Sequence, residues 1–103
     1  MAVRRPAVAG AFYAANPSSL KEQIIDSFNH LLGPGRLPDG KGGSDISAII
    51  APHAGYVYSG PIAGTAYAHL AHAAGAVRRV VLLGPAHWAP TRGLAASSAE
   101  AFA

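Results

Sequence analysis

The stretch Ile-Ser-Ala-Ile-Ile-Ala-Pro-His at residues 46–53 decides the fold class of this chain. Its first six residues form a short apolar run without strict alternation, which predicts a strand buried on both faces. Residues 79–83 read Arg-Val-Val-Leu-Leu and stop at a Gly-Pro pair, so they predict a second strand of the same kind. The two runs therefore indicate a buried sheet.

A helix is expected between the two strands, from about Gly60 to Ala74. Ser59 suits the N-cap, Pro61 falls in the first turn and Gly75 follows the end. Strand, helix and strand in this order form most simply a right-handed βαβ unit with parallel strands. The predicted fold class is therefore α/β.

Three other segments complete the organisation of the chain. A helix is expected at residues 17–32, because Asn16 is a favourable N-cap and apolar residues then recur at helical intervals. Ser19 and Glu22 have the spacing of a capping box, which gives an alternative start three residues later. The residues that give this helix one apolar face are Leu20, Ile24, Phe28 and Leu31. The glycine- and proline-rich residues 33–45 predict a surface loop without the pattern of a phosphate-binding loop. Residues 93–103 are expected to begin another strand.

The composition excludes several classes of function. The 103 residues are half apolar and 13% charged, which indicates a folded domain. The formal charge of +3 is spread along the chain, whereas a nucleic-acid-binding surface would cluster it, so no nucleic-acid partner is expected. No apolar run reaches the ~18 residues of a membrane helix, and no membrane association is expected. The sequence contains no cysteine, which fits a reducing compartment, and we expect a cytoplasmic protein.

The histidines that follow the two predicted strands are the strongest candidates for chemistry. Parallel strands end at the same edge of a sheet, and ligands bind outside those carboxyl ends. His53 follows the first run and His87 the second, so we expect the two imidazoles to share one metal centre. Imidazole suits iron, zinc and copper. The alternative is that each histidine is only a hydrogen-bonding loop residue, and it is their matched positions that favour the metal.

Residues close to these histidines are expected to shape a pocket. Gly55 allows the backbone to approach a ligand closely, and Tyr56 and Trp88 are expected to line the pocket with aromatic rings. A tyrosine hydroxyl can supply a proton, and Tyr58 is the candidate catalytic residue.

The strings Arg5–Tyr13, Ile50–Gly60 and Leu83–His87 resemble the Memo family, whose prokaryotic members are called AmmeMemoRadiSam system protein B. The resemblance implies a three-layer α/β/α fold like that of the class III extradiol ring-cleaving dioxygenases, which use non-heme ferrous iron. The family usually has proline at the position of Ala14, so a local loop change is expected there. Family members continue further, and we expect residues 1–103 to be the N-terminal portion of a single Memo-like domain.

The resemblance also assigns roles to individual residues. It implies that His53 and His87 are metal ligands and that Tyr58 lies near the same pocket. The aromatic pair of the family's opening motif falls on Phe12 and Tyr13, close to the cleft. The third metal ligand of the family has no counterpart in this sequence, so weak or partner-dependent metal binding is expected.

Two functions compete on these grounds. The first is a metal-dependent oxidoreductase of dioxygenase-like architecture, with iron(II) as the expected metal, copper or zinc as alternatives, and a small molecule as substrate. The second is a non-catalytic module that binds a peptide or a partner protein in the same cleft. An incomplete sheet would also leave an unpaired edge, which predicts a homo-oligomer formed through that edge.

Overall fold

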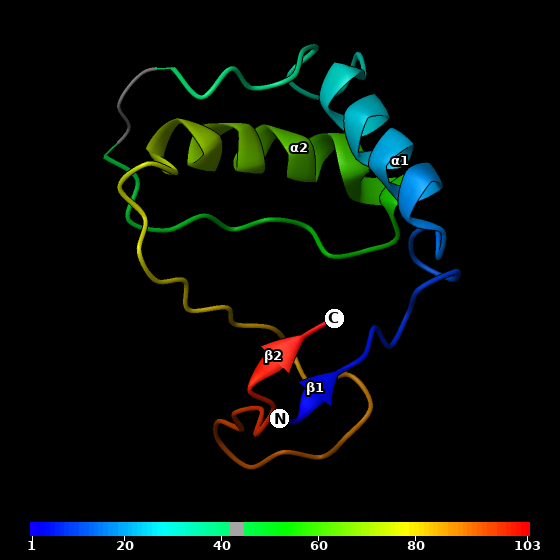
Figure 1. The fold of residues 1–103 in the computed structure, drawn as a ribbon, viewed down its shortest axis with the longest axis vertical. Coiled ribbons are helices and arrows are strands. Elements are labelled where there is room, and N and C mark those ends of the chain that lie inside the picture. The colour runs from blue at the N-terminus through cyan, green and yellow to red at the C-terminus, as the bar shows by residue number, and fades with distance from the viewer. Residues whose placement is uncertain (42–44) are drawn as a thin grey trace. The chain divides into compact units, whose positions relative to one another are not determined.

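The computed structural model describes residues 1–41 and 45–103, which form two units. The helical unit spans Val8–Val77, and the strand unit combines Met1–Ala7 with Arg78–Ala103. The elements along the chain are β1 (Val3–Arg4), α1 (Pro17–Asn29), α2 (Tyr56–Ala73) and β2 (Ala101–Phe102) (Figure 1). The two helices pack on each other, and the two strands pair with each other.

The start of α1 is set by local capping, as predicted. The Oδ1 atom of Asn16 accepts hydrogen bonds from the backbone N–H groups of Ser18 at 2.9 Å and Ser19 at 3.2 Å. The helix ends at Asn29, three residues before the predicted end. His30 leaves the helical conformation with ψ 148°, and its Nδ1 accepts a hydrogen bond from the N–H of Leu32 at 3.0 Å. This local bond replaces the last turn that periodicity alone predicts.

The start of α2 differs from the prediction by four residues, because Gly55 and not Ser59 is its N-cap. The Ser59 hydroxyl donates back to the carbonyls of Ala54 at 3.1 Å and Gly55 at 3.4 Å. The Ser59 hydroxyl, which lies within α2, therefore stabilises the turn at the start of this helix. Pro61 consequently lies within α2 and not in its first turn.

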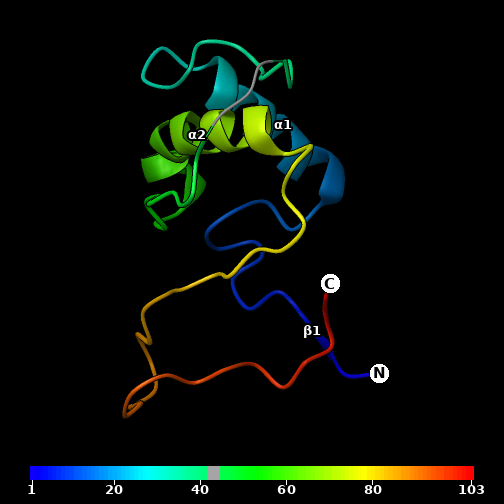
Figure 2. The same ribbon diagram turned by 90° about the vertical axis from the view of Figure 1, so that its left-hand side faces the viewer.

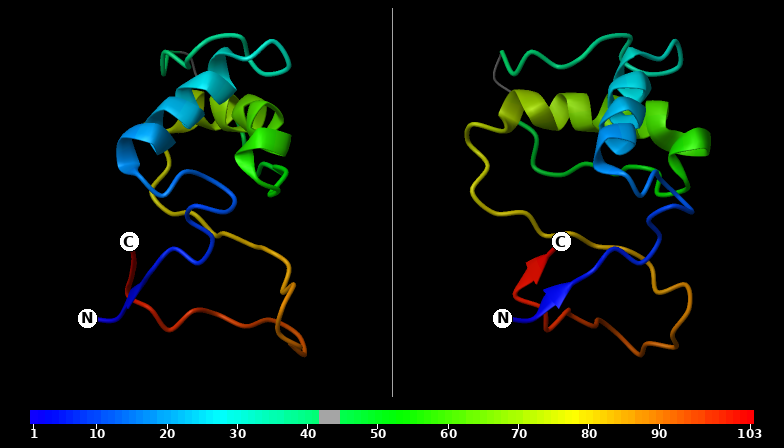
Figure 3. Two further views of the ribbon diagram at one scale, coloured as in Figure 1. Left: turned by 90° about the vertical axis from the view of Figure 1, so that its right-hand side faces the viewer. Right: turned by 45° about the vertical axis from the view of Figure 1, so that its right-hand side comes forward.

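The helices cross where small residues allow their backbones to approach (Figures 1 and 3). Gly60 and Gly64 lie four residues apart on one face of α2, and both face Ser27 of α1. A Cβ atom at Gly60 would lie 2.5 Å from Ser27 Oγ, and one at Gly64 would lie 3.4 Å from the Ser27 carbonyl oxygen. A side chain at position 60 would therefore displace the Ser27 hydroxyl, and the two glycines allow the close approach of the helices that Figure 2 shows from the side.

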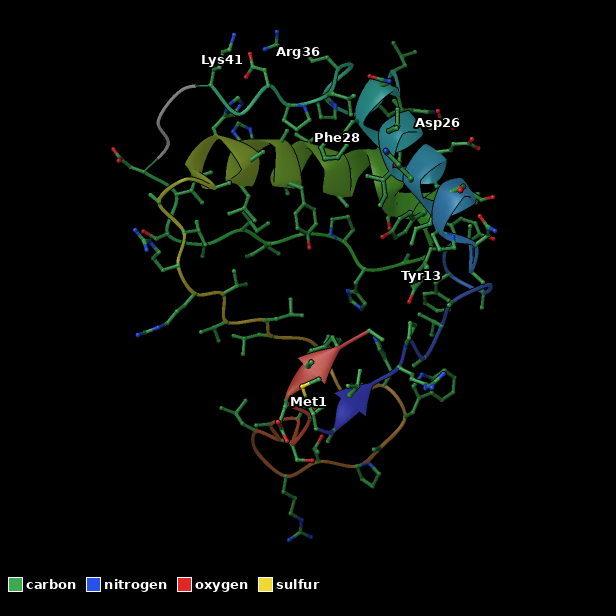
Figure 4. All side chains as sticks on the ribbon, in the orientation of Figure 1. Met1, Tyr13, Asp26, Phe28, Arg36 and Lys41 are labelled. Carbon is green, nitrogen blue, oxygen red and sulfur yellow. The ribbon has the colours of Figure 1, made fainter. Side chains whose placement is uncertain are left out.

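Little of the described chain is fully enclosed. Of the residues that the structure describes, those classed as buried are Ser59, Gly60, Gly64 and Ala73, and no large side chain is fully buried. In Figure 4 Phe28 lies on the side of α1 that faces α2, whereas Asp26 points away. The small core of the helical unit thus lies at the helix crossing.

The predicted strands at residues 46–51 and 79–83 are not strands in this structure, which describes both segments. The βαβ unit built on them is corrected accordingly. A strand needs a neighbour that pairs with its backbone, and no pairing involves these residues. Ile50 is 98% exposed, and the side chains of residues 80–83 are 71–84% exposed. Ile46, Ile49 and Ala51 are partly exposed and no residue of either run is buried, so the burial on both faces that the runs predict does not occur.

Parallel pairing occurs instead in the strand unit. Val3 of β1 pairs with Ala101 of β2, and Arg4 pairs with Phe102. The Arg4 guanidinium lies 6.0 Å from the centre of the Phe102 ring, a cation–π arrangement. β2 falls within residues 93–103, where another strand was expected. Two helices and a parallel two-stranded sheet are compatible with the α/β class.

Candidate functional site

The helical unit contains a cavity of about 470 Å³. Its wall is built by the segment before α1, by α1 itself, by residues 52–54 and by α2. The lining residues are Val8, Phe12, Tyr13, Ile24, Ser27, Phe28, Pro52, His53, Ala54, Tyr56, Ser59, Gly60, Ala63, Gly64 and Tyr67. A cavity of this size is within the range of small-molecule sites.

The wall of the cavity is mostly apolar. Among the described residues that line it, none is Asp, Glu, Lys or Arg. The polar groups that it offers are the imidazole of His53, the hydroxyls of three tyrosines and those of two serines. Such a wall suits an uncharged ligand, because a buried charge without a partner is strongly unfavourable.

A tight turn positions the first aromatic pair. Gly10 has φ 83°, a conformation that favours glycine, and its N–H donates to the carbonyl of Tyr13 at 2.7 Å. The carbonyl of Phe12 accepts a hydrogen bond from the N–H of Tyr56 at 2.8 Å. The N–H of Ala14 donates to Oε1 of Gln23 at 2.7 Å. These bonds fix the segment before α1 to both helices.

Tyr56 is the tyrosine whose chemistry the cavity alters most clearly. Its ring centre lies 5.6 Å from that of Tyr13, with an angle of 41° between the planes. Burial raises the pKa of Tyr56 above its ordinary value of 10.0, and the nearby hydroxyls of Tyr13 and Tyr67 raise this pKa further. The phenol of Tyr56 therefore stays protonated near neutral pH and remains a hydrogen-bond donor.

The structure brings some of the predicted site residues together. Phe12, Tyr13, His53 and Tyr56 all line the cavity. A Cβ atom at Gly55 would lie 3.3 Å from the carbonyl oxygen of Phe12, so this glycine lies next to the same segment without lining the cavity.

Three other predicted residues lie elsewhere. Tyr58 belongs to α2 but is 86% exposed and does not line the cavity. Trp88, which is 96% exposed, and His87 belong to the strand unit. The roles given to these residues stay predictions.

The metal-ligand prediction concerns His53 of the helical unit and His87 of the strand unit. Each of the two residues has an interaction partner. Within residues 1–41 and 45–103, no group of three His, Asp or Glu side chains is arranged to hold a metal. The two imidazoles suit iron, zinc or copper in chemical type. They supply at most two protein ligands, fewer than the three of a typical catalytic site.

Sequence reasoning missed several residues of the cavity wall. Ile24 and Phe28 were recognised only as the apolar face of α1, and Tyr67 was not assigned to a pocket. The signal was present in their spacing, because residues four apart on a helix share one face. What the spacing lacks is the information that this face borders a cavity and not a filled core.

In the described part of the chain, neither helix is long and apolar enough to cross a lipid bilayer.

Comparison with known proteins shows the family to which this chain is similar. The family model described as "Memo-like protein" matches residues 4–103. A MEMO1 family protein of Aeropyrum pernix is 52% identical over 102 residues, which covers 94% of this chain and 34% of that protein. A MEMO1 family protein of Methanothermobacter thermautotrophicus is 54% identical over 68 residues, 66% of this chain and 24% of that protein.

A third relative, from Methanopyrus kandleri, is 48% identical over 85 residues, which covers 82% of this chain and 30% of that protein. No solved structure matches the chain. The chain spans about a third or less of the length of these curated relatives. Because the family model covers nearly every residue and the identities are near 50%, the chain belongs to the Memo family.

Proposed function

We propose that this chain contributes His53 and His87 to a metal centre of a Memo-family protein, with iron(II) as the metal and a small uncharged molecule as the substrate. The observation that carries the proposal is the place of His53 on the wall of a mostly apolar cavity of about 470 Å³. A metal held there would lie beside a space for an organic ligand. The three-layer α/β/α fold and the dioxygenase-like reaction class belong to this proposal.

When bound, ferrous iron would supply a Lewis acid and a redox centre. The chain's own residues bind and orient the substrate. The apolar side chains of Phe12 and Phe28 exclude water, and the protonated Tyr56 hydroxyl donates a hydrogen bond to a substrate oxygen. We give this role to Tyr56 and not to Tyr58, because Tyr58 lies outside the cavity.

The test is anaerobic binding of ferrous iron by the full chain, measured by equilibrium dialysis. His53→Ala and His87→Ala should each weaken binding by at least about tenfold, since loss of even a supporting group around a metal typically has this effect. His69→Ala is the matched control, because His69 lies exposed on α2 and does not line the cavity. Binding that all three variants retain equally would refute the proposed ligands.

A second function is favoured by the uncharged, aromatic wall of the cavity. Such a wall equally suits a binding module that holds a small molecule or a peptide without turnover. Ligand binding that persists after a chelator has removed all metal, and that Tyr56→Ala abolishes, would support the module. Binding that requires the metal would support the metal centre.

A further inference from the structure

The cavity of the helical unit offers hydroxyl groups of two kinds to a ligand. Each serine hydroxyl on its wall donates its single proton to the protein itself. Ser27 donates to the carbonyl of Gln23 at 2.8 Å, and Ser59 donates to the carbonyl of Ala54 at 3.1 Å. Toward a ligand these serine oxygens therefore act as acceptors. The hydroxyl protons that the wall can donate to a ligand belong to its tyrosines.

Tyr13 and Tyr56 form a pair of phenols on this wall. Their ring centres lie 5.6 Å apart. Backbone hydrogen bonds hold both residues, because the carbonyl of Tyr13 accepts from Gly10 at 2.7 Å and the N–H of Tyr56 donates to Phe12 at 2.8 Å. Neither tyrosine hydroxyl forms a hydrogen bond with another described residue. The pair therefore offers two O–H donors on a backbone that is already fixed.

The electrostatics of the wall favour a neutral partner for these donors. Burial raises the pKa of Tyr56 above its ordinary value of 10.0, and the Tyr13 hydroxyl raises this pKa further, so the phenol remains a donor. The described lining residues include no lysine or arginine that would balance a ligand carboxylate. A negative charge in this mostly apolar cavity would therefore be unfavourable.

A carbonyl oxygen suits two neighbouring O–H donors. It has two lone pairs, so it can accept one hydrogen bond from each phenol, and it carries no proton of its own. A ligand hydroxyl also accepts, but its proton then needs a further acceptor in a mostly apolar wall. The rings of Phe12 and Phe28 line the same cavity, and aromatic rings pack well against other flat rings. Together these groups indicate a ligand with both an aromatic ring and a carbonyl.

We propose that the ligand of this cavity is a neutral aromatic carbonyl compound whose oxygen is held by the hydroxyls of Tyr13 and Tyr56. This assignment rests on the proposed function, in which the cavity is the substrate site, and it adds the chemical class of the substrate and a second binding residue, Tyr13. Tyr67 also lines the cavity, but its position on α2 is about 16 Å further along the helix axis than that of Tyr56. Tyr67 is therefore not part of the pair.

The experiment measures the dissociation constants of acetophenone and ethylbenzene for the full chain by NMR titration. The two probes share one skeleton and differ in the carbonyl oxygen. Because ethylbenzene leaves water more readily, the decisive quantity is the change that a substitution causes and not the ratio in the unchanged chain. Tyr13→Phe and Tyr56→Phe should each weaken acetophenone binding by about fivefold, the effect of one net hydrogen bond. Binding of ethylbenzene should stay the same, which shows that the cavity is intact.

Tyr67→Phe is the matched control, because it removes a hydroxyl from the same cavity and should leave the binding of both probes unchanged. An alkaline titration of the tyrosines in the unchanged chain gives a second readout that needs no variant. Bound acetophenone should raise the midpoint relative to bound ethylbenzene, since it accepts a hydrogen bond only from the protonated phenol. This titration decides the matter if a variant loses ethylbenzene binding as well.

Both measurements are made anaerobically, once with a chelator and once with ferrous iron, and iron binding is followed separately by equilibrium dialysis. Iron binding that is intact while acetophenone binding is insensitive to Tyr13→Phe and Tyr56→Phe would overturn the carbonyl assignment alone. Sensitivity to both substitutions in a chain that binds no iron would support the carbonyl assignment and refute the metal ligands. Acetophenone that binds in neither state, equal losses in all three variants, or an unchanged alkaline midpoint would also overturn the carbonyl assignment.

Discussion

Replacement of Gly60 by alanine tests the helix crossing most directly. A Cβ atom at this position would lie 2.5 Å from Ser27 Oγ, which is closer than real contacts of this type. The simplest relief is rotation of the Ser27 side chain, which gives up the bond from Oγ to the Gln23 carbonyl at 2.8 Å. Loss of one such hydrogen bond costs about 1 kcal/mol. Replacing glycine by alanine within a helix contributes about 1 kcal/mol in the opposite direction.

Gly60→Ala should therefore change the free energy of unfolding very little while Ser27 is present. In a Ser27→Ala background the clash with Oγ is absent, and the same change should stabilise the chain by about 1 kcal/mol. The assay is urea unfolding followed by helical circular dichroism, arranged as a double-mutant cycle. The expected coupling between positions 27 and 60 is about 1 kcal/mol.

Gly64→Ala is the matched control, because its Cβ would meet the backbone oxygen of Ser27 at 3.4 Å and not the side chain. Its effect should be the same with serine or alanine at position 27. Equal coupling at positions 60 and 64, or no coupling at either, would show that the crossing is not determined by this contact.

Two further predictions concern the cap of α1 and the cavity. Asn16→Ala should lower the free energy of unfolding by about 1 kcal/mol, because two N–H groups lose their acceptor, whereas Asn16→Asp should retain it; equal urea midpoints for the two variants would contradict this. The raised pKa of Tyr56 means that folding favours the protonated phenol, so its contribution to stability is complete below pH 10.0 and is lost as pH rises through the higher pKa of the folded state. Urea midpoints measured across this alkaline range should fall less steeply for Tyr56→Phe than for the unchanged chain, and parallel curves would refute the assignment.

Local signals predicted α1 well and α2 only in part. The cap of α1 is an asparagine that bonds to residues two and three positions later, so the sequence nearby contains the whole interaction. The start of α2 depends on Gly55 and on a backbone bond from Tyr56 to distant Phe12, which no local pattern encodes. Ser59 resembled a cap because its residue type is common there, although its hydroxyl serves the preceding turn.

The predicted strands show a different limit. The apolar composition of residues 46–51 and 79–83 indicates that these segments can form buried strands when neighbouring strands are present. Pairing depends on partners far along the chain, or on another chain, and the runs themselves do not contain those partners. Likewise, the positions of Phe12, Tyr13, His53 and Tyr56 around one cavity follow from the turn at Gly10 and the helix crossing. Phe12 and Tyr13 were selected by motif resemblance, whereas His53 and Tyr56 were selected because they follow a predicted strand that is not formed.

The hydrogen bond between the Phe12 carbonyl and the Tyr56 N–H has a consequence for the order of folding. The first turn of α1 closes on its own asparagine, so it can form while the rest of the chain is unfolded. In the first turn of α2, the N–H of Tyr56 donates to the carbonyl of Phe12, a residue that precedes α1 in the sequence. This contact requires closure of a long loop. Contacts of high sequence separation form slowly. The cavity, whose wall includes both Phe12 and Tyr56, therefore takes shape only when this late contact has formed.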